Sequence, residues 1–184
     1  ALYILADLLI DKGTRVGMEN PGYPDARNIF ELKSPQMVPL AVDDQGLVAD
    51  ANLSSCEFVY VTPSHQSPTT VTMPLSRREQ LLKQAEQNDI LVIEDDYESE
   101  INFVGDPTPA LKSLDASERV IYVGSLSKTL APGLRLGYMV APRPLIEEAR
   151  ALRRLMVRHP PANNQRIVAL FLSMGHHDSL IHRL

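Results

Sequence analysis

Residues 120–138 read VIYVGSLSKTLAPGLRLGY and are the most informative segment about the architecture of the chain. Its opening run is nearly continuous in apolar side chains, which is typical of a strand buried on both faces of a parallel sheet. The run ends in Ser125, Ser127 and Lys128. Turn-forming residues commonly follow strands, but that tendency does not account for a lysine directly after Ser-Leu-Ser. Because ligands bind at the carboxyl ends of strands in open α/β sheets, the stretch predicts a strand that brings Lys128 to a ligand site.

Apolar strands and amphipathic helices alternate in both directions from this stretch. We predict strands at residues 15–20, 37–42, 58–63, 90–96, 120–127 and 137–142, and helices at residues 1–13, 76–89, 144–159 and 163–175. For the helix at 76–89 we expect Ser76 as the N-cap and Glu79 as its capping-box partner. The alternation predicts an α/β protein, a three-layer α/β/α sandwich with a mostly parallel sheet.

Composition restricts the classes of protein to consider. The formal net charge of −5 argues against a nucleic-acid surface in this chain, because such surfaces need clustered Lys and Arg. No apolar run reaches the roughly 18 residues that cross a bilayer, so we expect no membrane partner. The single cysteine, Cys56, excludes an intrachain disulfide and fits a reducing cytoplasm. The histidines near residue 180 have no cysteine or acid cluster beside them, and we expect no metal site.

Polar and aromatic side chains follow three further predicted strands. They are Glu94, Asp95, Asp96 and Tyr97 after the first, Ser64, His65 and Gln66 after the second, and Glu19, Asn20 and Tyr23 after the third. Strand ends also attract turn-forming residues, which is a sufficient account of Asn20. With Lys128, however, four strand ends together offer a lysine, acids, hydroxyls and an aromatic ring, which predicts one site at this edge of the sheet.

Four segments resemble the motifs of one family. Residues 124–138 resemble the lysine motif of fold-type I enzymes that depend on pyridoxal 5'-phosphate (PLP), in the class I/II aminotransferase family. Residues 93–97 resemble the segment with the pyridine-nitrogen acid, residues 20–24 the segment with the ring-stacking aromatic, and residues 62–69 the loop that reads Asn-Pro-Thr-Gly in aminotransferases. The combination of Pro-Ser-His-Gln with Glu-Asp-Asp-Tyr is most similar to MocR/GabR-type transcriptional regulators of the GntR family. In these regulators an aminotransferase-like domain follows a winged-helix DNA-binding domain.

The resemblance implies catalytic roles for three residues. Lys128 would form the Schiff base with the cofactor. Asp95 would face the pyridine nitrogen and keep it protonated, so that the ring accepts electrons. Asp95 could instead be a capping acid, and its neighbour Asp96 could take the role in its place. Tyr97 would point the same way as Asp95 along an extended segment and reach the phenolic oxygen of the cofactor.

Further residues would hold the cofactor and its ligand. Tyr23 would stack on the ring, with plain core packing as the alternative. The phosphate would be bound by Ser125, Ser127 and Arg135, and Arg135 could instead serve a structural ion pair. Arg27 is a candidate for the substrate carboxylate, although a solvated helix arginine explains it equally well.

The loop at 66–70 departs from the enzyme pattern. Ser67 stands where aminotransferases place an asparagine that contacts the phenolic oxygen, and Thr70 stands where they place glycine. The change alters hydrogen bonding to that oxygen. We therefore expect PLP binding, with Ser67 beside the cofactor, but leave open whether the protein is an efficient enzyme.

The resemblance also bears on domain organisation. Residues 1–184 would form an incomplete PLP-binding large domain, with residues 143–184 leading toward a C-terminal small domain outside this chain. No capping residue precedes the first helix and no terminator follows the last apolar pattern, so we expect both ends to continue into a longer protein. As in the family, the strand at 137–142 should run antiparallel to its neighbour, and the full-length protein should be a homodimer.

Two functions compatible with PLP remain. In the first, the chain binds an amino acid as an external aldimine and is the effector domain of a MocR/GabR-like regulator, which contacts DNA through a domain outside this chain. The alternative is a free-standing class I aminotransferase, similar to those acting on 2-aminoadipate or kynurenine. A nucleotide-binding α/β domain would need a Gly-x-Gly-x-x-Gly turn after a strand, which the sequence lacks.

Overall fold

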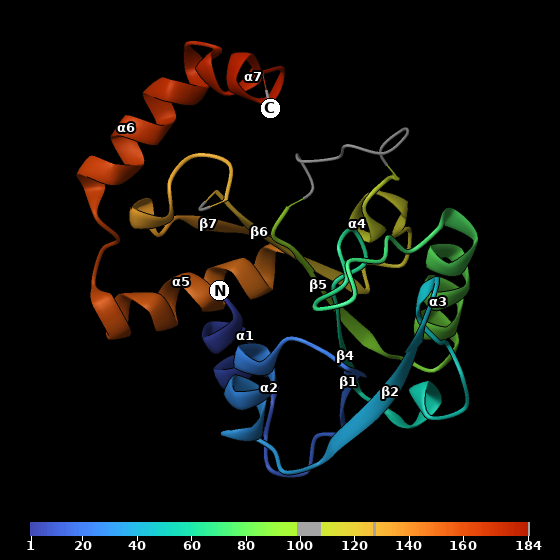
Figure 1. Ribbon diagram of the computed structural model, residues 1–184. Coiled ribbons are helices and arrows are strands. Elements are labelled where there is room, and N and C mark those ends of the chain that lie inside the picture. Colours follow the sequence, from blue (N-terminus) through green and yellow to red (C-terminus); the bar gives the residue numbers. More distant parts are fainter. Residues whose placement is uncertain (99–107, 127, 184) are drawn as a thin grey trace.

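The chain folds into a mostly parallel sheet with helices on both faces (Figure 1). The structure is a computed structural model that describes residues 1–98, 108–126 and 128–183. The helices are α1 (Leu2–Leu9), α2 (Pro24–Glu31), α3 (Leu75–Gln87), α4 (Leu111–Leu114), α5 (Arg143–Val157), α6 (Ala162–Ser173) and α7 (His176–Ile181), with 3-10 turns η1 (Leu53–Ser55) and η2 (Pro132–Leu134). The strands are β1 (Val16–Asn20), β2 (Met37–Asp43), β3 (Gly46–Leu47), β4 (Phe58–Val61), β5 (Leu91–Asp96), β6 (Val120–Ser125) and β7 (Gly137–Val140). No helix of this described part is long and apolar enough to cross a membrane.

The described strands lie in the order β3-β2-β1-β4-β5-β6-β7. Strands β2, β1, β4, β5 and β6 are parallel, whereas β7 pairs antiparallel with β6, which confirms the expected direction of that strand. The short β3, which the sequence did not predict, pairs antiparallel with β2. The chain moves outward from β1 to β2 and then returns to β4 on the other side of β1. Ligand sites in open α/β sheets lie at such reversals, outside the carboxyl ends of the strands.

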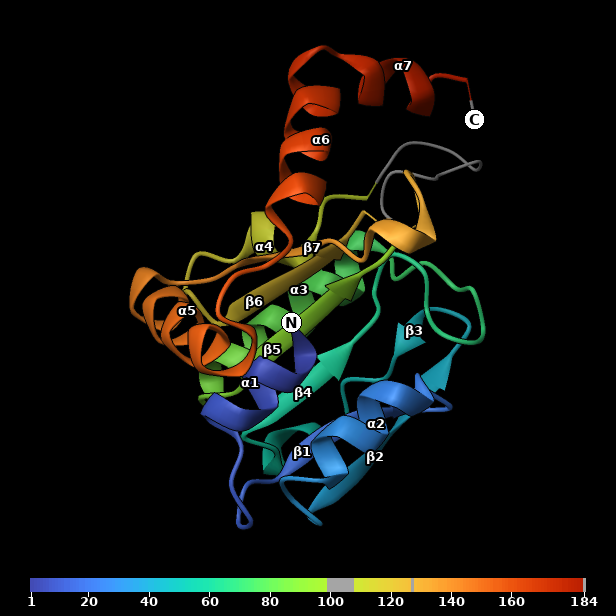
Figure 2. The same cartoon turned by 90° about the vertical axis from the view of Figure 1, so that its left-hand side faces the viewer.

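Each face of the sheet has its own apolar core, as the predicted three-layer sandwich requires. Figure 2 shows α1, α2 and α5 across one face and α3 behind the other. The core on the α1/α2 side includes Leu5, Phe30, Tyr60, Ile93 and Val123; the core on the α3 side includes Leu53, Leu81, Val92, Leu111 and Val120. Alternate residues of β5 and β6 therefore belong to opposite cores, as the two-residue period of a strand dictates.

Several bounds of the predicted elements are wrong, and three of these differences concern how a helix or strand begins or ends. Helix α3 begins at Leu75, with Pro74 as an N-cap that makes no side-chain hydrogen bond, so Ser76 is inside the helix and caps nothing. The extended backbone of Pro74 turns the chain into the helix, and its carbonyl accepts hydrogen bonds from the backbone N–H groups of Arg77 and Arg78. Strand β6 ends at Ser125, two residues before the predicted limit. The last predicted helix ends at Ser173, and a separate α7 starts after Gly175, whose positive φ of 71° suits glycine.

One buried arginine ties together the loops that follow the strands. Arg78 on α3 is fully buried and donates hydrogen bonds to the carbonyls of Met73 (3.0 Å), Pro63 (2.9 Å) and Pro109 (3.0 Å). Its guanidinium lies 3.8 Å from the equally buried carboxylate of Glu94. A buried cation with these partners holds the loop after β4 and the loop before α4 at the same edge of the sheet.

Arg78→Ala should lower the free energy of unfolding by about 3–5 kcal/mol, because it leaves a buried acid and three carbonyls without their partner. Arg77→Ala is the matched control: Arg77 is the next residue, but its partners are the exposed Asp43 and one carbonyl, and the expected loss is about 1 kcal/mol. Urea titrations of both variants measure the difference. Equal losses would contradict the role assigned to Arg78.

Candidate cofactor site

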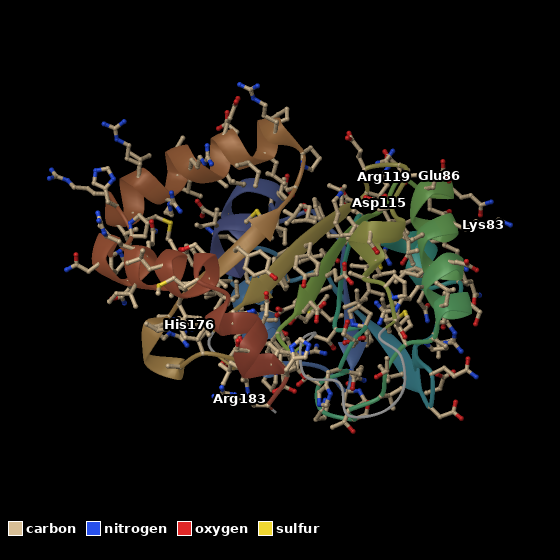
Figure 3. The ribbon with its side chains drawn as sticks, turned by 90° about the horizontal axis from the view of Figure 1, so that it is seen from above. Lys83, Glu86, Asp115, Arg119, His176 and Arg183 are labelled. Atoms are coloured by element: carbon tan, nitrogen blue, oxygen red, sulfur yellow. The ribbon has the colours of Figure 1, made fainter. Side chains whose placement is uncertain are left out.

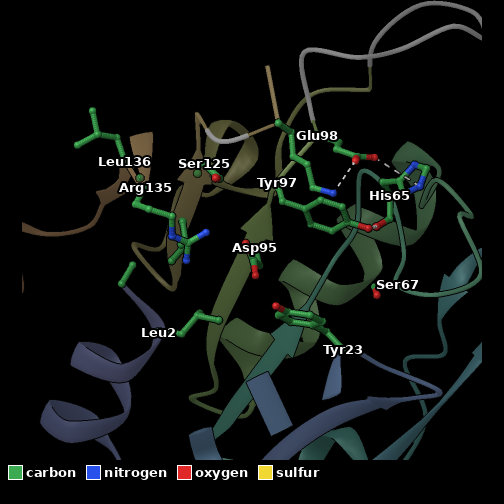
Figure 4. Close-up of a pocket in the computed structure, with 15 residues that line it drawn as sticks. Leu2, Tyr23, His65, Ser67, Asp95, Tyr97, Glu98, Ser125, Arg135 and Leu136 are labelled. Atoms are coloured by element: carbon green, nitrogen blue, oxygen red, sulfur yellow. Dashed lines mark hydrogen bonds and ion pairs between the residues drawn. The ribbon is translucent and has the colours of Figure 1, made fainter. Parts of the chain in front are cut away.

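A cavity of about 620 Å³ opens at the carboxyl edge of the sheet (Figure 4). The start of α1, the segment before α2, the loop after β4, the ends of β5 and β6, and the turn before β7 all contribute to it. Its walls are formed by Ala1, Leu2, Tyr23, His65, Ser67, Asp95, Tyr97, Glu98, Val123, Gly124, Ser125, Lys128, Arg135, Leu136 and Gly137. The structure thus brings together most of the side chains that the sequence singled out, from positions more than a hundred residues apart.

Asp95 and Asp96 occupy opposite sides of β5. Asp95 lines the cavity, and its Oδ2 accepts a 2.6 Å hydrogen bond from the hydroxyl of Tyr60. Asp96 is buried on the α3 side, where its Oδ2 accepts a 3.1 Å hydrogen bond from Tyr122. Burial raises the pKa of Asp95, while the hydrogen bond from Tyr60 opposes that rise. Of the two neighbours, Asp95 is the acid that can reach a ligand in the cavity.

Lys128 lies at the rim, with 55% of its side chain exposed. Its Nζ is 3.5 Å from Oε1 of Glu98 and 6.0 Å from the centre of the Tyr97 ring. The other carboxylate oxygen of Glu98 lies 3.7 Å from Nε2 of His65. Glu98 therefore links the lysine to the loop after β4, and Figure 4 shows these contacts as dashed lines.

Glu98 is a site residue that the sequence interpretation missed. Strict strand alternation would place it on the same side as Asp96, away from Tyr97. Strand β5 ends at Asp96, however, and the chain bends directly afterwards, so both Tyr97 and Glu98 line the cavity. Only the position of the strand end could have shown that Glu98 lies in the cavity, and apolar patterning does not locate a strand end to one residue.

Tyr97 shares the cavity with Asp95, as their spacing predicts. Its hydroxyl donates a 2.8 Å hydrogen bond to the carbonyl of His65, and the two rings meet edge to face at 6.0 Å. Burial, followed by the nearby charge of Glu98, raises the pKa of Tyr97 to about 12. The hydroxyl thus stays protonated near neutral pH and acts as a hydrogen-bond donor.

The remaining predicted site residues divide into three groups. Tyr23, Ser67, Ser125 and Arg135 line the cavity. Ser127 lies outside the described residues. Arg27 does not line the cavity, and its guanidinium lies 3.5 Å from the carbonyl of Glu19, so its substrate role stays a prediction.

Two of the lining side chains are held by local geometry. The hydroxyl of Tyr23 donates a 3.0 Å hydrogen bond to Asp25, which fixes the ring at the cavity wall. Arg135 follows η2 in a left-handed conformation (φ 49°, ψ 41°), which is uncommon for a residue with a side chain. The turn of η2 thereby sets the position of a guanidinium opposite the ends of β5 and β6.

A buried glutamate supports the loop that carries His65 and Ser67. Glu19 is fully buried at the end of β1, and its Oε2 accepts hydrogen bonds from the hydroxyl of Thr62 (2.7 Å), the Thr62 N–H (3.3 Å) and the side chain of Gln66 (3.2 Å). No hydrogen bond reaches its buried Oε1 within the described residues. Burial raises the pKa of Glu19 from 4.5 to about 7 despite these donors.

A second, smaller cavity of about 280 Å³ lies between α3 and the turn before β6. Figure 3 shows Lys83 and Glu86 on α3 near Asp115 and Arg119 of that turn. Asp115 already accepts hydrogen bonds from the backbone of Arg119 and Val120 and pairs with a lysine, so its carboxylate stabilises the turn. The described residues contain no cluster of three or more metal-ligating side chains.

The fold and the larger cavity define a class of protein. The chain belongs to the aminotransferase class I and II family, whose model matches residues 1–178.

Known proteins of two kinds are similar to this chain. It is 48% identical to the HTH-type transcriptional regulator TauR of Rhodobacter capsulatus. It is 38% identical to the probable rhizopine catabolism regulatory protein MocR of Rhizobium meliloti. Each match covers 100% of this chain and 38% of the regulator. Among solved structures, the multiple substrate aminotransferase of Thermococcus profundus (TM-score 0.95) and the kynurenine aminotransferase of Pyrococcus horikoshii, solved with PMP (TM-score 0.94), are each 30% identical over 99% of this chain and 48% of theirs. The chain thus spans less than half the length of these proteins.

The buried carboxyl of Glu19 predicts a specific dependence of stability on pH. Its pKa is about 7 in the folded chain and close to 4.5 when unfolded, so between these values the folded state binds more protons. Its contribution to the free energy of unfolding is therefore present at low pH and is lost as the pH rises from about 4.5 to 7. Glu19→Gln should remove this component, and the variant should gain stability relative to wild type over that range.

Denaturant titrations at several pH values between 4 and 8 measure the effect, and Glu31→Gln, at an exposed position on α2, is the control. A parallel pH profile for wild type and Glu19→Gln would show that Glu19 ionises normally in the folded chain.

Proposed function

We propose that this chain is the PLP-binding, aminotransferase-like effector domain of a MocR/GabR-like transcriptional regulator, and that Lys128 holds the cofactor covalently. The observation that carries the proposal is that Lys128, Asp95 and Arg135 line one cavity at the carboxyl edge of the sheet. Family membership and the similar structures solved with PMP or a phosphopyridoxyl-leucine compound indicate pyridoxal phosphate as the cofactor.

The residues present fit this group. PLP supplies an aldehyde that bonds to amines and a pyridine ring that accepts electron density when its nitrogen is protonated. Asp95 offers a partly buried carboxylate to hold a proton at that nitrogen. Arg135 and Ser125 offer charge-assisted and neutral hydrogen bonds to a phosphate, and Tyr23 offers a ring to cover one face.

The proton on Lys128 has a defined neighbour. A lysine must lose its proton before its amine can bond to an aldehyde. Glu98 lies 3.5 Å from Nζ, and its other oxygen faces His65. The carboxylate is placed to hold Lys128 at the rim of the cavity.

The similarity to regulators favours binding of an effector over catalytic turnover as the function of this chain. The relatives at 48% and 38% identity are named as regulators, whereas the similar solved aminotransferases share 30% identity. Ser67 lines the cavity where the resembled enzymes carry an asparagine. The ligand we propose is an amino acid, bound in a cytoplasmic homodimer whose DNA contacts lie outside this chain.

Lys128→Ala should abolish covalent attachment of the cofactor and leave the fold intact, because a half-exposed lysine contributes little packing. With PLP, the wild-type holoprotein should show a visible absorbance band, and borohydride should fix the reduced cofactor to Lys128. Peptide mapping locates the label. A label on Lys12, Lys33, Lys83 or Lys112 instead would contradict the assignment.

Asp95→Asn should weaken PLP binding by up to about 3–5 kcal/mol, because it keeps the shape but removes the charge that would face the pyridine nitrogen in a partly buried site. Asp96→Asn should affect PLP affinity far less, since that side chain lies on the α3 side of β5. PLP titrations of both variants measure the difference. Equal losses, or a larger one for Asp96→Asn, would overturn the assignment of Asp95.

A further inference from the structure

We propose that Tyr60 is the positioning residue for Asp95: its hydroxyl holds one carboxylate oxygen, keeps the acid ionised and leaves the other oxygen to the pyridine nitrogen. The inference rests on the proposed function, since it assigns Asp95 to that nitrogen. Tyr60 does not line the cavity and was not among the residues that the sequence pointed to.

The register of the sheet brings the two side chains together. Tyr60 on β4 is paired with Ile93 on β5, and Asp95 lies two residues beyond Ile93. Residues two apart on a strand point to the same face, so Tyr60 and Asp95 both face the α1/α2 side. The tyrosine ring spans the remaining distance, and its hydroxyl lies 2.6 Å from Oδ2 of Asp95.

Packing fixes the hydroxyl in place. Tyr60 is 1% exposed and belongs to the core on the α1/α2 side, where its ring meets that of Phe30 at 5.7 Å and 58°. A ring enclosed in this way cannot turn to another acceptor without opening the core. The donor is therefore preorganised before any cofactor binds.

The hydrogen bond divides the carboxylate between two tasks. Oδ2 of Asp95 is occupied by Tyr60, and no hydrogen bond reaches Oδ1 within the described residues. Figure 4 shows the Asp95 side chain among the lining residues of the cavity. A hydrogen bond to an ionised acceptor stabilises the charged form, which counteracts the burial of Asp95.

Charge balance explains why the donor is needed. Without Tyr60 the partly buried carboxylate would be more basic and would take the proton from the pyridinium, leaving two neutral groups. The ring nitrogen would then lose the charge that makes the ring accept electrons. Tyr60 thus acts through Asp95 on the location of one proton.

The adjacent pair on the other face provides a matched control. Tyr122 on β6 donates a 3.1 Å hydrogen bond to Oδ2 of Asp96, so it also joins a tyrosine on a neighbouring strand to an acid of β5. That pair lies on the α3 side and does not line the cavity. Tyr60→Phe and Tyr122→Phe each remove one tyrosine hydroxyl, and the two hydroxyls lie on opposite faces of β5.

The test uses the holoprotein loaded with PLP labelled with 15N at the pyridine nitrogen. In wild type and Tyr122→Phe, the nitrogen chemical shift should be that of a protonated ring. In Tyr60→Phe it should move to the unprotonated position, and PLP should dissociate about 10- to 100-fold more readily, as expected for the loss of a hydrogen bond to a charged group. A purely structural role for Tyr60 would not move the nitrogen signal.

The outcomes separate the two proposals. If borohydride does not label Lys128 in wild type, the proposed function fails. If it does, and the nitrogen stays protonated in Tyr60→Phe, the function stands and the role of Tyr60 is overturned. Should Tyr60→Phe not fold, 3-fluorotyrosine at position 60 keeps the ring and strengthens the donor; PLP should then bind more tightly, and unchanged affinity would overturn the role.

Discussion

The burial of both faces of β5 is the constraint on which the site depends. A parallel strand covered by helices on each side has no solvent to hydrate its polar groups, so every acid on it needs a partner or a cavity. Glu94 meets this need with the backbone N–H groups of Leu111 and Lys112, at 2.8 and 2.9 Å, and Asp96 with Tyr122. Asp95 is the acid of this strand that lies beside a cavity, which is why its chemistry differs from that of its neighbours.

Partners for the buried charges also set the shape of the cavity. Arg78 beside Glu94 anchors the loop after β4 from below, and Glu19 with Gln66 anchors the same loop from the side of β1. Both anchors lie outside the cavity and are fully or almost fully buried. The loop that presents Ser67 is therefore held to the sheet by two buried side chains, and Ser67 lines the cavity from it.

Apolar runs predicted the layers and most strands, because they report burial directly, whereas the antiparallel direction of β7 was expected from the family resemblance. The sequence predicted cavity residues that lie at or just beyond the end of a strand, as Asp95, Tyr97 and Lys128 do. It could not find Tyr60, whose partner lies 35 residues away on another strand, since only the register of the sheet reveals that pair. The prediction of Ser76 as the N-cap was wrong, because α3 begins after Pro74 and no side chain caps it. The carbonyl of Pro74 accepts the first backbone hydrogen bonds of the helix.

The floor of the cavity is fixed by packing, whereas its rim is exposed. At the floor, the Tyr60 ring is enclosed by core packing and its hydroxyl donates to Asp95, so the position of that carboxylate is set by the fold. At the rim, Lys128 is half exposed and contacts Glu98, whose other oxygen faces His65 on a separate loop. The two ends of the cavity therefore differ: its floor is held by core packing, and its rim is held by contacts between partly exposed side chains.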